Sequence, residues 1–173
     1  MGTDRDTLRA ALLDQLAYLI DELEAQKALL HRIPDWALEG RPFEGEWSIK
    51  ERYGALAAAD VSVHLPQLRR IVEEDTPALE APDRQALMTS EAWNEVEIGP
   101  LLERVQAART ALTAFLRTLT PEQWARTGSV GGVPQDVYAY VHAVIQHDAD
   151  GLRAIGYRLH ESHLTARPSD LPK

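Results

Sequence analysis

The chain has 173 residues, 45% of them hydrophobic and 26% charged, and a formal net charge of −9; this is the balance of one folded domain and not of a disordered chain. The cations are not clustered, so nucleic-acid binding is not expected, and no apolar run approaches the roughly 20 residues that span a bilayer. Because there is no cysteine, disulfides, thiolate metal sites and a cysteine nucleophile are excluded, and a polar N-terminus without the features of a signal peptide favours a cytoplasmic location.

The first predicted helix covers about residues 7–31. Its leucines recur at spacings of three, four or seven, which places them on one stripe. They are Leu12, Leu16, Leu19, Leu23 and Leu30. A second apolar band consists of Leu8, Leu13, Ile20 and Leu29. This band is interpreted either as the interface of a homodimer or as the mark of a helix that is deeply buried or covered by a loop.

The second predicted helix begins at Ser48, because Glu51 follows three residues later and completes a capping box. It continues to about Glu73. Pro66 removes a backbone donor and crowds the preceding turn, which predicts a kink near His64. The proline-rich and acidic segment after this helix predicts a long crossing loop, with a short helical piece around residues 92 and 93.

The third predicted helix follows Pro100, with apolar residues at alternating spacings of four and three up to Leu119. Residues 120–123, Thr-Pro-Glu-Gln, form a second capping box that opens a short helix. Residues 128–132, rich in glycine, are interpreted as a flexible loop. The fourth helix is expected to begin near Pro134 and to run to about His160, and no sheet is expected.

Four amphipathic helices of this length bury their apolar stripes only against one another, so the chain is predicted to be all-α, a four-helix bundle with a long crossing loop between the second and third helices. The predicted domain covers residues 1–163. Residues 164–173 are expected to form a loose C-terminal tail.

Three segments of the chain resemble the DinB-like superfamily of four-helix bundles, in matching order and spacing from about residue 7 to residue 160. The segment Trp-Ser-Ile-Lys-Glu at residues 47–51 resembles the opening of that family's second helix. The segment LRTLTPEQW at residues 116–124 is similar to the part that precedes its glycine loop. Residues 147–155 resemble its His-Asp-x-x-His-Leu-x-x-Ile stretch.

The resemblance implies a divalent metal held by three histidines, one early in the second helix and two spaced by four residues in the fourth. Three protein ligands leave one position open for water or substrate, as catalytic zinc requires. At the matching positions this sequence has Ala55, His147 and Gly151. His147 is therefore the only retained ligand, and no metal or other cofactor is expected unless other side chains rescue a zinc or nickel site.

A cleft that binds a small ligand is predicted around Ala55, His147 and Gly151, with Trp47 and Tyr138 near its mouth. No nucleophile and base can be paired from the sequence, so no catalytic residue is assigned. The favoured function is a binding or stress-associated bundle protein without the family's metal-dependent activity. The alternative is a transferase or hydrolase that uses bacillithiol or mycothiol in the cleft around His147. The expected partners are a second copy of the chain and a small ligand, and neither nucleic acid nor a membrane.

Overall fold

A computed structural model describes residues 2–41 and 43–165 of the chain. Its helices, in chain order, are α1 (Gly2–Leu30), α2 (Asp35–Glu39), α3 (Ile49–Ala59), η1 (Asp60–His64), α4 (Leu65–Glu73), α5 (Arg84–Met88), η2 (Trp93–Glu95), α6 (Ile98–Thr118), α7 (Pro121–Trp124) and α8 (Val137–Thr165). Its strands are β1 (Ala78–Leu79), β2 (Thr127–Val130) and β3 (Val133–Asp136). The predicted tail at residues 164–173 lies almost entirely outside the described residues.

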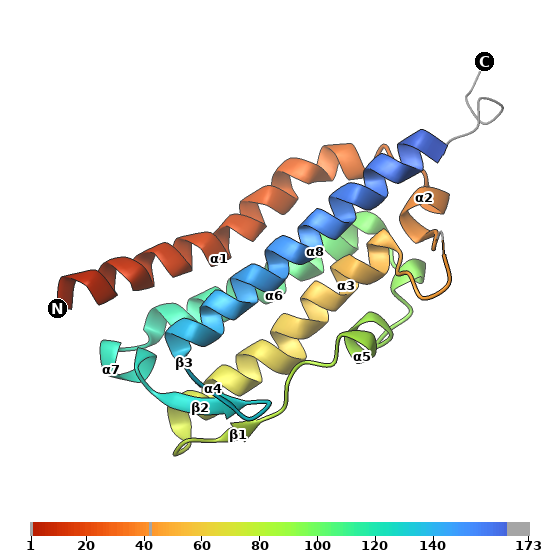
Figure 1. Ribbon diagram of the computed structural model, residues 1–173. Coiled ribbons are helices and arrows are strands. Elements are labelled where there is room, and N and C mark those ends of the chain that lie inside the picture. Colours follow the sequence, from red (N-terminus) through yellow and green to blue (C-terminus); the bar gives the residue numbers. More distant parts are fainter. Residues whose placement is uncertain (1, 42, 166–173) are drawn as a thin grey trace.

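Four long helical rods form the bundle: α1, the continuous segment α3–η1–α4, α6 and α8 (Figure 1). The leucine stripe predicted for the first helix is buried throughout, from Leu12 to Leu30. Two apolar clusters fill the space between the rods, one around Leu16, Leu112 and Val141 and the other around Leu23, Tyr53 and Val105. The predicted all-α four-helix class is confirmed. In the described part of the chain, no helix is both long and apolar enough to cross a bilayer.

The second rod changes its winding where a kink was predicted. Residues 60–64 form a π-helix, and the backbone N–H of Leu65 donates to the carbonyl oxygen of Asp60 instead of to the oxygen one residue later. Pro66 stands in the first turn of α4 and has no N–H to donate. The wider turn adjusts the rod to this missing donor, and it turns both Asp60 and His64 into the interior.

The expectation that the chain has no sheet is wrong, because three short strands pair at one end of the bundle (Figure 1). β1 pairs with β2 in parallel, and β2 pairs with β3 in an antiparallel hairpin. The hairpin turn is Gly131-Gly132, and both glycines have positive φ, at 55° and 83°. Such a two-residue turn matches the twist of the strands, so this glycine segment is a hairpin and not a flexible loop.

The fourth rod consequently begins at Val137, three residues later than Pro134, which belongs to β3. The Asp136 side chain accepts a hydrogen bond from the backbone N–H of Ala139 at 2.8 Å. This bond satisfies one of the donors that a helix start leaves free, and it sets where α8 begins.

The close packing of Trp93 on Gly54 predicts that one added methyl group at position 54 has a large effect on stability. A Cβ atom on Gly54 of α3 would lie 2.1 Å from a ring carbon of Trp93, which is fully buried against this helix. We therefore expect Gly54→Ala to lower the free energy of unfolding by about 3 kcal/mol, despite the better helix propensity of alanine. Urea denaturation of the two proteins measures the difference.

Gly156→Ala is the matched control, because a Cβ there meets open space on a helical surface. It should leave the stability unchanged or raise it by up to about 1 kcal/mol. Equal effects of the two substitutions would contradict the close packing of Trp93 on α3.

Candidate functional site

The three positions that the resemblance singles out lie together. Ala55 on α3 and His147 and Gly151 on α8 line one small cavity of about 30 Å³, which is closed by residues of α5. His147 and Gly151 are four residues apart, so they share one face of α8. The volume is sufficient for about one water molecule. The predicted juxtaposition is therefore present, in a space much smaller than an open cleft.

Trp47 and Tyr138 are not among the residues that line this cavity. Trp47 lies under the guanidinium of Arg41, which is 4.9 Å from its ring centroid. Tyr138 is buried in the core, with its ring centroid 5.0 Å from that of Trp124.

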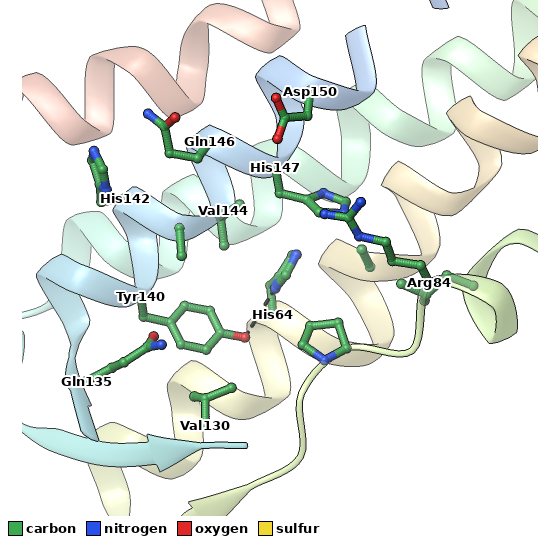
Figure 2. A pocket seen from close by; sticks show the side chains of 14 residues that line it. His64, Arg84, Val130, Gln135, Tyr140, His142, Val144, Gln146, His147 and Asp150 are labelled. Carbon is green, nitrogen blue, oxygen red and sulfur yellow. Dashed lines mark hydrogen bonds between the residues drawn. The ribbon is translucent and has the colours of Figure 1, made fainter. Parts of the chain in front are cut away.

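His147 also borders a larger pocket of about 520 Å³, between α8, the π-helix, the segment before α5 and the hairpin (Figure 2). Its polar lining includes His64, Arg84, Gln135, Tyr140, His142, Gln146, His147 and Asp150. Its apolar walls come from Ala59, Pro82, Leu87, Val130, Ala143 and Val144. This size and this mixture of many apolar with a few polar groups are typical of sites for small molecules.

Arg84 brings a positive charge to His147. It lines both cavities, and its side chain reaches from the start of α5 toward the imidazole (Figure 2). Burial lowers the pKa of His147, and the charge of Arg84 lowers it further. Within the described residues no carboxylate forms an ion pair with Arg84, and its side chain is exposed to solvent.

A chain of hydrogen bonds leads from two residues of the larger pocket, His64 and Tyr140, to Gln67 and Glu80 outside its lining. The Gln67 amide nitrogen donates to the carbonyl oxygen of Glu80 at 2.8 Å, and the Tyr140 hydroxyl donates to Gln67 Oε1 at 2.7 Å. His64 Nδ1 lies 3.1 Å from the Tyr140 oxygen. His64 is only 6% exposed, and this burial lowers its pKa to about 4. The imidazole is therefore neutral at pH 7.

Behind the pocket, a buried ion cluster joins three rods. The Arg109 guanidinium of α6 donates two hydrogen bonds to Asp60 of the π-helix, at 2.7 and 3.1 Å, and two to Asp148 of α8. Arg109 and Asp60 are each 1% exposed. Burial raises the pKa of the Asp60 carboxyl more than Arg109 lowers it, whereas the two carboxylates raise the pKa of Arg109. The cluster fixes the π-helix against α6 and α8.

The donor set does not fit the three-histidine metal site that the resemblance implies. Ala55 and Gly151 have no ligand atom, and Asp148, next to His147, turns inward to Arg109. Within the described residues no three His, Asp or Glu side chains gather as a metal would require. The Arg84 cation beside the imidazole would also repel a divalent ion. No chemistry of this site is therefore assigned to a bound metal.

Sequence reasoning missed several residues of this site. His64 was singled out as the place of a kink and not as a site residue, yet it lines the same pocket as His147. Arg109 stands between Val105 and Leu112 on the inward face of α6. A charged residue on an apolar stripe is the signal that could have pointed to the ion cluster. Arg84 carries no comparable signal.

Comparisons with known proteins agree with this architecture. The model of the DinB superfamily matches residues 18–155 of the chain. Among solved structures, the chain is similar to YfiT from Bacillus subtilis, described as a probable metal-dependent hydrolase with an unusual four-helix bundle topology. The TM-score is 0.65 at 20% sequence identity, over 86% of this chain and 87% of that one, a likeness that shows the fold. No protein of curated function matches.

Proposed function

The chain belongs to the DinB superfamily, and from that premise we propose that it binds a small ligand without the family's metal, in the pocket bordered by His147. The observation that carries this proposal is the replacement of two ligand positions by Ala55 and Gly151, together with a guanidinium beside the remaining imidazole. The Arg84 side chain, which lines the same small cavity, thus brings a cation to the place where relatives of this kind are expected to hold a metal cation. The larger pocket supplies the volume for the ligand.

Elemental analysis tests the proposal. The protein should be purified without a metal-affinity resin and dialysed, and its zinc, nickel, manganese and iron should then be measured. The expected content is well below one metal ion per chain, and added zinc should not raise the melting temperature, because a ligand that binds only the folded state would do so. A stoichiometric metal that survives dialysis would overturn the proposal.

A second candidate function is that of a thiol-dependent transferase or hydrolase that uses bacillithiol or mycothiol. It is favoured by the two imidazoles, His64 and His147, that border one pocket, since a neutral imidazole can accept the proton of a thiol. Consumption of either thiol with 1-chloro-2,4-dinitrobenzene, measured for the protein and for His147→Gln, would test it. A rate equal to the uncatalysed rate would exclude this activity for that electrophile.

We also propose that the protein pairs with a second copy through α1. Tyr18, Leu29 and Leu8 are 62%, 56% and 48% exposed along this helix, whereas Leu13 of the predicted second band packs on the core. A lasting C2 contact needs on the order of 1,200 Å² of buried surface. Light scattering at micromolar concentration should show twice the chain mass of 19.3 kDa.

Salt dependence gives the dimer a second test. Two chains of charge −9 repel each other, so an apolar interface should strengthen as salt screens the repulsion. Tyr18→Ser with Leu29→Ser should shift the protein to the monomer. A clean species of 19.3 kDa from the unaltered protein, or a dimer that salt dissociates, would refute the proposed interface.

A further inference from the structure

The hydrogen bonds that join Gln67, Tyr140 and His64 determine which nitrogen of His64 carries the proton. The backbone carbonyl of Glu80 can only accept, so the Gln67 nitrogen faces it and the Gln67 oxygen faces Tyr140. The single hydroxyl proton of Tyr140 is used in donating to that oxygen. The Tyr140 oxygen therefore accepts from His64 Nδ1, which must carry a hydrogen. A neutral imidazole protonated on Nδ1 has a lone pair on Nε2.

This lone pair has no donor in the described chain. His64 Nδ1 forms a hydrogen bond with the Tyr140 hydroxyl, and Nε2 forms none with the described residues. In Figure 2 the second ring nitrogen lies on the side turned away from Tyr140, and the ring borders the pocket of about 520 Å³. The His64 side chain is only 6% exposed, but Nε2 is not among the buried polar atoms that lack a partner, so this atom is open to the pocket. The pocket is the place from which a donor can reach it.

The pocket is also bordered by the solvent-exposed guanidinium of Arg84, which forms an ion pair with no carboxylate among residues 2–41 and 43–165. Arg84 can give a carboxylate two parallel hydrogen bonds. The acidic residue that borders the pocket, Asp150, accepts a hydrogen bond from Arg153 at 3.2 Å on the exposed face of α8. Between the polar groups lie the apolar walls formed by residues such as Pro82, Leu87 and Val130.

We propose that this pocket selects a small carboxylic acid that carries a hydroxyl group on an apolar body. The carboxylate binds the Arg84 guanidinium, the hydroxyl donates to His64 Nε2, and the apolar body lies against the walls. This inference rests on the proposed function, because it names the ligand class of the same metal-free pocket. Gln67 and Tyr140 act as positioning residues, because they hold the imidazole in the tautomer that accepts.

The first test needs no ligand. Long-range proton–nitrogen NMR correlations of the histidine rings distinguish a ring protonated on Nδ1 from one protonated on Nε2. In the unaltered protein at pH 7, His64 should show the Nδ1–H pattern, and in Tyr140→Phe it should lose that single pattern. An Nε2–H pattern in the unaltered protein would overturn the proposal.

The second test uses three matched probes in calorimetric titrations: 4-hydroxyphenylacetate, phenylacetate and 4-hydroxyphenethyl alcohol. The hydroxy acid should bind about fivefold more tightly than phenylacetate, the gain of one net hydrogen bond. The alcohol, which lacks the carboxylate, should bind about tenfold more weakly than the hydroxy acid. Equal affinities of the two acids, or no binding of either at millimolar concentration, would overturn the proposal.

Two variants separate the contacts. Arg84→Gln should weaken both acids about tenfold and leave the alcohol unchanged. Tyr140→Phe should remove the preference for the hydroxy acid and leave phenylacetate unchanged; a preference that persists would contradict the role of Tyr140. If the protein binds stoichiometric zinc but keeps the His64 tautomer and the preference for the hydroxy acid, only the proposal of a metal-free site is refuted. If the protein is metal-free but does not bind the probes as expected, only the proposed ligand class is refuted.

Discussion

Arg109→Met should lower the free energy of unfolding by about 3–5 kcal/mol, the typical effect of removing one partner from a buried ion pair. The reason is the carboxylate of Asp60, which is 1% exposed and would lose both the two hydrogen bonds from Arg109 and the charge that balances its own. Methionine fills much of the space of the arginine stem, so most of the loss should come from charge and not from a cavity. Urea denaturation at pH 7.5 measures it.

Arg70→Met is the matched control. Arg70 forms an ion pair with Glu74 one helical turn away, and both side chains are 47% exposed. Such surface pairs contribute about 0.5 kcal/mol or less. A loss for Arg109→Met no greater than that for Arg70→Met would contradict the role of the buried cluster.

The pH dependence gives an independent check with a defined sign. Burial already raises the pKa of Asp60 in the folded protein, and removal of the Arg109 charge raises it further. A carboxyl whose folded pKa is raised above its unfolded value lowers the stability as the pH rises from the unfolded to the folded pKa, so the penalty shrinks as the pH falls through this window. The deficit of Arg109→Met should therefore be smaller at pH 5 than at pH 7.5. Asp60→Asn combined with Arg109→Met should recover part of the loss at both values.

The long helices and their starts could be predicted because their signals are local. The leucine stripe from Leu12 to Leu30 repeats within a few residues. Both predicted capping boxes are present, with Ser48 bonded to Glu51 and Thr120 bonded to Gln123. In each box the side chain and the backbone donor are three residues apart, so the interaction needs no tertiary contact.

The sheet could not be predicted from local pattern alone. Its first strand has two residues, and Ala78 pairs with Ser129, 51 positions later. A strand this short shows no alternation of apolar and polar residues. The Gly131-Gly132 turn between Val130 and Val133 was the one local indication of a hairpin, and it was interpreted as a loop.

The candidate site likewise has residues that could be predicted from the sequence and residues that could not. Ala55, His147 and Gly151 could be placed together because the family resemblance supplied the register of two helices. The partnership of His64 with Tyr140 spans 76 positions, and it depends on the π-helix that turns His64 inward. Arg84 lies on a short helix in the crossing segment, where periodicity does not predict the direction of a side chain.

Restoring the two absent ligands should create zinc binding that the parent lacks. We expect Ala55→His with Gly151→His, combined with Arg84→Ala, to bind one zinc ion per chain at least about 100-fold more tightly than the parent. His147 is already in place, and all four altered or retained positions line the same small cavity. Competition with a chromophoric zinc chelator measures the affinity and the stoichiometry.

A histidine is easier to accommodate at position 151 than at position 55. A Cβ atom on Gly151 would lie 3.8 Å from Leu56 Cδ2, an ordinary contact, and a helical glycine is about 1 kcal/mol less favourable than alanine. Ala55 is buried against Leu87 of α5, so a histidine there requires α5 to yield. Removal of the Arg84 side chain gives room and takes away a charge that repels the ion.

Two further variants make the result decisive. Ala55→His alone, with two histidines, should bind zinc far more weakly than the full variant, because three protein ligands are the usual minimum of a catalytic site. The double variant that keeps Arg84 should fall between them, because it has the ligands and also the opposing cation. Helical circular dichroism and urea denaturation should show that each variant is folded. If the full variant is folded and still binds zinc no better than the parent, then α3 and α8 do not hold positions 55, 147 and 151 in a metal-binding register. The absence of a metal would then follow from the backbone as well as from the side chains.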